Sequence, residues 1–309
     1  MYVHMRELKK YVLDLQVVAV ERVHERYVLL RLTHEKPLPE MCPGQFVEVR
    51  VDGSSSTFLR RPISINFIDR DKNELWLLVA VVGDGTRRLA CLHAGDTLNC
   101  VLPLGNGFSL MSEDGSLMSE DGSPMSEGGS EPSALSPQPS YLLVGGGVGV
   151  APLLYLGKVL KGQGLTPTFL LGARTKNDLL MLSEFEKYGR VLVTTEDGSM
   201  GEKGFVTNHS VLQDEPFDMI QCCGPTPMMK AVARYAHEKG IACEVSLENL
   251  MACGLGACLC CVEKVKNLPL TPYEERGDLD ASLAHNELVN VCVCKEGPVF
   301  NINRLLWQN

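Results

Sequence analysis

The chain has 309 residues, of which 45% are hydrophobic and 22% are charged, a balance typical of a folded soluble protein with two or three domains. The formal net charge of −9 argues against a nucleic-acid-binding surface. The basic start is not followed by an apolar stretch, and glycines and a proline interrupt the most apolar segment, residues 141–160. We therefore expect no signal peptide, no membrane-spanning helix and a cytoplasmic location, where the twelve cysteines are metal ligands or buried apolar residues rather than disulfides.

The first part of the chain has the pattern of an all-β domain. Short runs rich in Val, Leu and Ile are separated by turn signals such as PLPEMCPG and VDGSSS. The predicted strands are residues 11–23, 27–33, 45–51, 61–68 and 75–83. Strands of this length and spacing predict a small barrel or sandwich over residues 1–108.

Residues 109–140 form an insert of different composition. From residue 111 the sequence repeats MSEDGS and then becomes rich in Ser and Pro. Such a segment buries too little apolar area to offset the entropy of ordering, so we expect a disordered junction between domains.

The following part, residues 141–246, alternates between strand and helix patterns. Alternation of this kind predicts a parallel sheet with helical crossover connections. The predicted strands are residues 142–146, 168–174, 191–197 and 217–224, and the predicted helices are residues 151–162, 179–189 and 227–240. A cysteine-rich subdomain, residues 247–309, completes the chain.

Two motifs in the β half point to a diphosphate. The guanidinium of Arg61, in FLRRPISI, suits a diphosphate, and the Ser64 hydroxyl adds a contact. The glycines of VVGDGTRRLA allow close backbone approach to phosphate before a helix-like stretch. Each motif alone is more often a plain turn, but together they resemble the FAD-binding antiparallel barrel of ferredoxin-reductase-type flavoproteins. The resemblance implies FAD contacts at Arg61, Pro62, Ile63, Ser64, Leu78, Val79, Ala80, Gly85 and Thr86; Ile63 replaces the tyrosine common in that superfamily.

The segment LLVGGGVGVAP predicts a strand, a glycine-rich turn and a helix with proline in its first turn. Backbone amides of such a turn bind pyrophosphate, although the strict G-x-G-x-x-G fingerprint is absent and any tight turn could look similar. The candidate NAD-binding residues here are Gly145, Gly146, Gly147, Gly149 and Pro152.

A second segment of this half, QCCGPTPMM, resembles the part of ferredoxin-reductase-type proteins that lies beside the nicotinamide. The resemblance implies that Gly224 and Pro225 contact NAD and that Cys223 lies near the hydride path; a simply buried cysteine is the alternative. Arg174 stands near the position of the usual ribose-binding acid, so the sequence does not decide between NAD and NADP.

The stretch ACGLGACLCCVE has the spacing Cys253-x4-Cys258-x2-Cys261, which is the plant-type [2Fe–2S] spacing and needs one distant fourth cysteine. Its glycines suit a loop that wraps a cluster. Zinc sites favour two C-x2-C pairs, which are not available here. The fourth ligand is Cys294 or Cys292, which would share one face of a strand; the turn signal after Cys294 favours it, and Cys292 fits packing in an apolar run.

Taken together, RRPISI, VGDGT, GGGVGVAPLL, CGPTPMM, ACGLGACLCCV and VCKEGPVF resemble the electron-transfer subunits of class 1B dihydroorotate dehydrogenases. This family independently selects Cys294. The resemblance implies FAD, a [2Fe–2S] cluster and NAD as cofactors. The insert and the long gap between the third and fourth cysteines depart from the family pattern.

The chain has no eight-fold βα repeat, so dihydroorotate oxidation would belong to an FMN-containing partner subunit, in an expected heterotetramer of two copies of each chain. Electrons would pass from that FMN through the cluster and FAD to NAD+, in pyrimidine biosynthesis. The alternatives are a related reductase subunit of the sulfhydrogenase or ferredoxin:NADP oxidoreductase type, and a non-enzymatic zinc-binding or scaffold protein.

Overall fold

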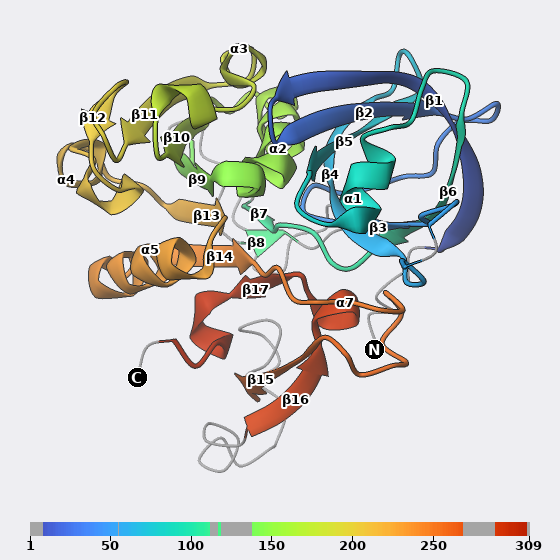
Figure 1. The fold of residues 1–309 in the computed structure, drawn as a ribbon. Coiled ribbons are helices and arrows are strands. Elements are labelled where there is room, and N and C mark those ends of the chain that lie inside the picture. Colours follow the sequence, from blue (N-terminus) through green and yellow to red (C-terminus); the bar gives the residue numbers. More distant parts are fainter. Residues whose placement is uncertain (1–8, 55, 112–116, 119–137, 268–287, 308–309) are drawn as a thin grey trace.

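The computed structural model describes residues 9–54, 56–111, 117–118, 138–267 and 288–307. Its first half is a closed antiparallel barrel with strand order β1-β2-β5-β4-β3-β6 (Figure 1). The strands are β1 (Tyr11–His24), β2 (Tyr27–Thr33), β3 (Phe46–Val49), β4 (Arg61–Asp69), β5 (Glu74–Ala80) and β6 (Thr97–Leu104). Alternate residues such as Val47 and Val49 are wholly buried inside it. The predicted barrel is confirmed.

The closing strand, β6, was not among the predicted strands. Its sequence, TLNCVLPL, contains two polar residues and Pro103, which weaken the strand pattern. In the structure β6 pairs with β1 on one side and β3 on the other. Closure of the barrel therefore stabilises β6 as a strand, because both of its edges form backbone hydrogen bonds with neighbouring strands.

The second half is a seven-stranded sheet in the order β12-β11-β10-β9-β13-β14-β17. All of its pairings are parallel except that of β17 with β14. The strands are β9 (Tyr141–Gly146), β10 (Thr168–Ala173), β11 (Arg190–Thr195), β12 (Glu202–Lys203), β13 (Met219–Cys223), β14 (Ala242–Ser246) and β17 (Val299–Asn301). The longer helices are α2 (Ala151–Gly162) and α5 (Thr226–Lys239), as predicted to within one residue.

The predicted helix over residues 179–189 is wrong in length, because the α-helix here, α3, spans only Leu182–Phe185. Met181 has a left-handed φ of 55°, so a right-handed helix cannot pass through this residue and α3 begins only after it. At the other end, a Cβ at Gly189 would stand 2.1 Å from the Pro167 carbonyl oxygen, so the chain has already turned back to the sheet. The remaining short elements are α1 (Asp84–Leu89), α4 (Val211–Asp214), η1 (Gly147–Val150), η2 (Lys176–Asp178), η3 (Val206–Asn208) and η5 (Ile302–Arg304).

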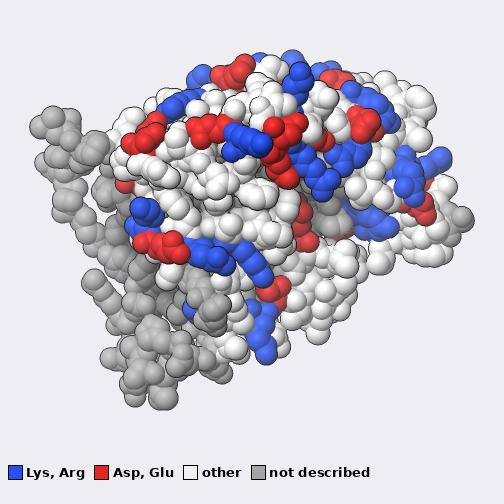
Figure 2. All heavy atoms as spheres, turned by 60° about the vertical axis from the view of Figure 1, so that its left-hand side comes forward, with Lys and Arg blue, Asp and Glu red and all other residues white. Residues whose placement is uncertain are grey.

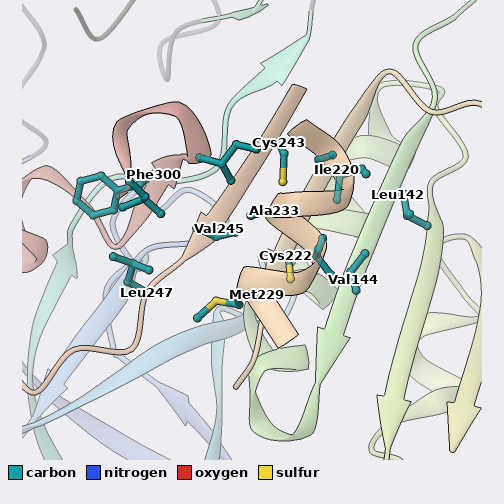
Figure 3. Packing of buried hydrophobic residues seen from close by; sticks show 14 of the residues in the cluster. Leu142, Val144, Ile220, Cys222, Met229, Ala233, Cys243, Val245, Leu247 and Phe300 are labelled. Atoms are coloured by element: carbon teal, nitrogen blue, oxygen red, sulfur yellow. The ribbon is translucent and has the colours of Figure 1, made fainter. Parts of the chain in front are cut away.

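Helix α5 covers one face of the sheet through its apolar stripe. Met229, Val232, Ala233 and Ala236 are buried, at the spacing of a single helix face. Figure 3 shows Met229 and Ala233 beside the strand residues of the same cluster, including the cysteines Cys222 and Cys243. Full burial of a valine or methionine side chain, such as Val232 or Met229, stabilises the fold by about 1.5–3 kcal/mol.

The C-terminal segment forms the hairpin β15 (Val262–Lys266) and β16 (Leu288–Cys292), then α7 (Val293–Glu296), before β17 joins the large sheet. It lies beneath the barrel and the sheet in Figure 1. In the insert, β7 (Leu110–Met111) pairs with β8 (Leu117–Met118). The disorder predicted for the rest of the insert falls mainly on 112–116 and 119–137, outside the described residues.

Acidic and basic side chains are interspersed over the face in Figure 2. Among the described residues, none of the helices combines the length and apolarity needed to cross a membrane.

Candidate functional site

The two predicted FAD motifs meet at the start of β4. Arg61 begins this strand and pairs with Val49 of β3. A Cβ at Gly85, in the first turn of α1, would stand 2.9 Å from Nε of Arg61. The guanidinium also donates to the Leu59 carbonyl oxygen at 2.8 Å. The glycine turn of the second motif therefore lies directly against the arginine of the first, as a shared diphosphate site would require.

The other predicted FAD contacts differ in what their side chains can reach. Leu78 and Val79 are 2% and 0% exposed, so neither residue presents appreciable surface to a ligand in this structure. The Thr86 hydroxyl accepts from the Val82 and Gly83 amides and donates to the Gly83 carbonyl, so it holds the turn itself. Pro62, Ile63, Ser64 and Ala80 are half-buried.

The two predicted NAD motifs also come together. A Cβ at Gly149 would lie 2.4 Å from Cα of Gly224, and one at Gly146 would lie 2.6 Å from the Met228 sulfur. Gly147 has a left-handed φ of 56°, and α2 follows with Pro152 in its first turn. Pro225 is exposed beside these glycines. The ends of β9 and β13 thus form one glycine-lined edge of the sheet, where ligands of such sheets bind.

Cys223 ends β13 at this edge and is 2% exposed. Burial, with a smaller contribution from the Glu248 carboxylate, raises the pKa of its thiol well above the usual range. The thiol therefore stays protonated at neutral pH, and Cys223 offers shape and a weak hydrogen-bond donor rather than a thiolate nucleophile.

The four predicted cluster ligands are thiols without disulfide partners, and the structure brings them into one region. The Gly256 amide donates to Sγ of Cys294 at 3.1 Å, and the Cys294 amide donates to Sγ of Cys261 at 3.4 Å. The Leu255 amide donates to Sγ of Cys253 at 3.3 Å. Amides aimed at sulfurs are the environment of a bound iron–sulfur cluster.

The loop between Cys253 and Cys261 adopts this shape through left-handed residues at Gly254, Gly256 and Leu259, with φ of 67°, 78° and 58°. Cys260 is exposed whereas Cys261 is 2% exposed, so the two adjacent side chains point in different directions. Among the described residues, no three His, Cys, Asp or Glu side chains gather as a single metal-ion site. The four thiols Cys253, Cys258, Cys261 and Cys294 are the residues that would hold a [2Fe–2S] cluster, which takes four cysteine thiolates.

The thiols differ in their ionisation. Desolvation opposes ionisation of Cys253, but the amides of Leu255 and Cys258 and the Cys258 thiol lower the pKa of Cys253 to about 6. Burial and the neighbouring Cys261 raise the pKa of Cys294 to about 12. Cluster binding must therefore displace a proton from Cys294, whereas Cys253 is largely ionised beforehand.

Cys292 and Cys294 differ from their predicted placement in two respects. The two residues do not share a strand, because β16 ends at Cys292 and Cys294 lies in α7. Cys294 is the buried residue, at 1% exposed, and Cys292 is half-buried with its thiol donating to the Gly256 carbonyl at 3.7 Å. The short helix α7 brings Cys294 to Cys261. Strand periodicity, which would place Cys292 and Cys294 on one face, does not apply within a helix.

Comparison with known proteins adds an independent line of evidence. The family model of the oxidoreductase NAD-binding domain matches residues 143–234 of the sequence. The dihydroorotate dehydrogenase B (NAD(+)) electron transfer subunit of Shouchella clausii is 37% identical over 265 residues, which cover 85% of this chain and 86% of that one. The corresponding subunit of Streptococcus pneumoniae serotype 4 is 36% identical over 286 residues, 93% of this chain and 97% of that one.

The chain belongs to the family of dihydroorotate dehydrogenase B electron transfer subunits.

This membership makes it an oxidoreductase subunit, as the sequence indicated. A solved structure of an NADH-dependent reduced ferredoxin-NADP oxidoreductase is also similar, with a TM-score of 0.72, 29% identity and coverage of 95% of this chain and 90% of that one. The ferredoxin reductase of carbazole 1,9a-dioxygenase, at 17% identity and a TM-score of 0.58 over 76% of this chain and 68% of that one, shares the fold.

One residue of this electron transfer subunit that sequence reasoning missed is Glu48 of β3. It is 0% exposed, and neither carboxylate oxygen has a hydrogen-bond partner among the described residues. Burial raises its pKa to about 7, although Arg60 opposes the shift. A Cβ at Gly254 would stand 2.7 Å from Cγ of Glu48, so the cysteine loop packs onto it. A lone acidic residue inside the apolar run QFVEV was the only sequence signal.

Proposed function

We propose that this subunit carries electrons from a catalytic partner subunit to NAD+. The barrel holds FAD around Arg61 and Gly85, the sheet edge at Gly149 and Gly224 holds NAD, and Cys253, Cys258, Cys261 and Cys294 hold a [2Fe–2S] cluster. When bound, the flavin exchanges a hydride with nicotinamide and the cluster takes one electron at a time, so the two together convert between these forms.

The observation that carries the proposal is the contact of the cysteine loop with the barrel strand that pairs with the flavin motif. Gly254 packs on Glu48, and Glu48 pairs with Pro62 of β4. The loop that would hold the cluster thus packs on β3, the strand adjacent to the one that would hold FAD. Electron transfer between two cofactors needs such proximity.

The residues of the chain have separate tasks in this scheme. Arg61 binds and orients the diphosphate through charge-assisted hydrogen bonds. The turn at Gly147 presents amides to a second pyrophosphate at the positive end of α2. Cys223 shapes the place of the nicotinamide ring and keeps its own proton. The left-handed residues of the cysteine loop aim amides at the sulfurs, which stabilises negative charge there.

The partner is an FMN-containing subunit that oxidises dihydroorotate, in a heterotetramer of two copies of each chain, acting in the cytoplasm in pyrimidine biosynthesis. Exposed leucines on and beside the cysteine loop support a partner-facing surface: Leu250, Leu255 and Leu259 are 85%, 50% and 63% exposed. Large apolar side chains gathered on a surface mark interaction sites.

The test uses the purified chain with its cofactors. It should oxidise NADH with an artificial electron acceptor and show no dihydroorotate oxidation until the FMN-containing subunit is added. Dihydroorotate turnover by the single chain would contradict the division of labour between the two subunits.

A related reductase subunit serving another partner is the second candidate, and the 29% identity to the ferredoxin-NADP oxidoreductase chain favours it. The higher identity to the dihydroorotate dehydrogenase B subunits, 37%, favours the first. Copurification separates them, because each candidate predicts a different bound chain.

A further inference from the structure

The turn between β1 and β2 of the barrel reaches across to the parallel-sheet domain. Nη2 of Arg26, in this turn, lies 2.7 Å from Oδ1 of Asp178, which ends the short helix η2 after β10. The Asp178 carboxylate also accepts from the Thr175 hydroxyl at 2.9 Å. In Figure 1 the joined ends of β1 and β2 point toward α2 and its sheet. The ion pair holds the turn in place against the domain that carries the glycine-rich motif.

The next residue, Tyr27, lies at that motif. Its hydroxyl oxygen is 3.9 Å from the position of a Cβ at Gly147, and no other heavy atom of the described residues, apart from the turn's own backbone and chain neighbours, lies within 4 Å of that position. Tyr27 is half-buried and packs on the same apolar cluster as Val148. Its ring lies 5.3 Å from that of His24, which limits its movement. The phenol therefore borders open space directly above the glycine turn.

The Tyr27 hydroxyl makes no hydrogen bond within the described part of the chain, although hydroxyls in such half-buried places usually find a partner. The amide groups of the Gly147 turn are the groups that approach a pyrophosphate. A phenol O–H beside them is a donor suited to a phosphate oxygen.

We propose that Tyr27 is a further binding residue for the dinucleotide, donating its hydroxyl hydrogen to the pyrophosphate of NAD(H) above Gly147. The inference rests on the proposed placement of NAD at this turn. The dinucleotide site is then shared between the two domains, with the barrel supplying one donor. The Arg26–Asp178 ion pair sets the position of that donor, so it contributes to affinity without touching the ligand.

The experiment measures the dissociation constant of NADH for the cofactor-loaded full chain and its variants. Tyr27→Phe removes only the donor and should weaken binding about tenfold, which corresponds to about 1.4 kcal/mol. FAD content should not change. Arg26→Gln should weaken binding in the same direction but by less. Tyr11→Phe is the matched control, because Tyr11 lies at the far end of β1, and it should leave the constant unchanged.

A second variant separates the inference from the placement on which it rests. Gly147→Ala puts a methyl group into the proposed pyrophosphate position at a left-handed φ, and it should weaken NADH binding. If Gly147→Ala weakens binding and Tyr27→Phe does not, the role of Tyr27 is refuted. If neither variant changes the constant, both the placement and the inference are refuted. If Tyr27→Phe loses FAD while NADH binding is retained, the hydroxyl serves the flavin and the inference is overturned.

Discussion

Gly149 and Gly224, 75 residues apart in the chain, lie back to back, with 2.4 Å between a Cβ built on Gly149 and Cα of Gly224. The contact joins the turn after β9 to the turn after β13, and the atoms that a Cβ on Gly149 would meet are backbone atoms of Cys223 and Gly224. A side chain at Gly149 therefore cannot be accommodated by a rotamer change. The relationship explains why the first motif needs glycine at this position and gives the first prediction.

Gly149→Ala should reduce NADH oxidation with an artificial acceptor at least tenfold while FAD is retained, because the two turns must separate. Gly162→Ala is the matched control. Gly162 ends α2, and a Cβ there meets nothing within 4 Å, so the change should leave activity intact and stabilise the protein by about 0.5–1 kcal/mol. Steady-state kinetics and thermal unfolding measure both. Unchanged activity in Gly149→Ala would argue against a nicotinamide site at this edge.

Arg61→Ala should yield protein that is depleted in FAD but retains iron. The loss corresponds to about 1.5–3 kcal/mol of binding free energy for a charge-assisted contact. Arg87→Ala is the comparison, because Arg87 is an exposed arginine nearby whose ion pair with Asp84 is a surface pair. Flavin absorbance and iron analysis of the purified variants decide the matter, and full FAD occupancy in Arg61→Ala would count against the diphosphate assignment.

Cys294→Ser and Cys261→Ser should abolish or grossly alter the electron paramagnetic resonance signal of the reduced protein. The Cys294 amide donates to Sγ of Cys261 at 3.4 Å and the Gly256 amide donates to Sγ of Cys294 at 3.1 Å, so the two thiols lie at the same loop. Cys260→Ser and Cys292→Ser should keep the signal. A normal signal in Cys294→Ser together with its loss in Cys292→Ser would reverse the assignment of the fourth ligand.

Glu48→Gln should change how stability depends on pH. Burial raises the pKa of Glu48 from 4.5 to about 7, so between these values the native state binds a proton that the unfolded state has lost. The free energy of unfolding therefore falls as pH rises through this range in the natural protein. The variant has no carboxyl group here and does not lose stability in this way. Its free energy of unfolding should exceed that of the natural protein by about 3 kcal/mol above pH 7, and the difference should vanish below pH 4.5.

Denaturant unfolding of the cofactor-loaded protein at pH 5 and pH 8 measures this difference. Glu186→Gln, at an exposed position, is the control and should run parallel to the natural protein at both pH values. If the free energy of unfolding of Glu48→Gln changes between pH 5 and pH 8 as it does in the natural protein, the Glu48 carboxylate is solvated, and the burial seen in the structure does not hold in solution.

Local patterns were sufficient for much of the fold. The strand runs of the barrel and the helices α2 and α5 were predicted because alternation and 3.6-residue periodicity are properties of neighbouring residues. Strand β6 was not predicted, because its strand pattern is weak and pairing with β1 and β3 in the closed barrel supplies its stability. The helix predicted over residues 179–189 was too long, because the left-handed Met181 and the close approach of Gly189 to Pro167 depend on the chain's path around the sheet.

The sequence by itself determined which chemical groups this protein has: a thiol spacing for iron, an arginine beside proline for a diphosphate, and glycines where backbone must approach a ligand. Only the tertiary structure decided which of these meet. It placed Cys294 in a helix facing Cys261, set Gly254 on the buried Glu48, and brought Tyr27 of the barrel to Gly147. The physical reason is that residue spacing describes one segment at a time, whereas burial, desolvation and contact between distant segments arise only when the whole chain is packed.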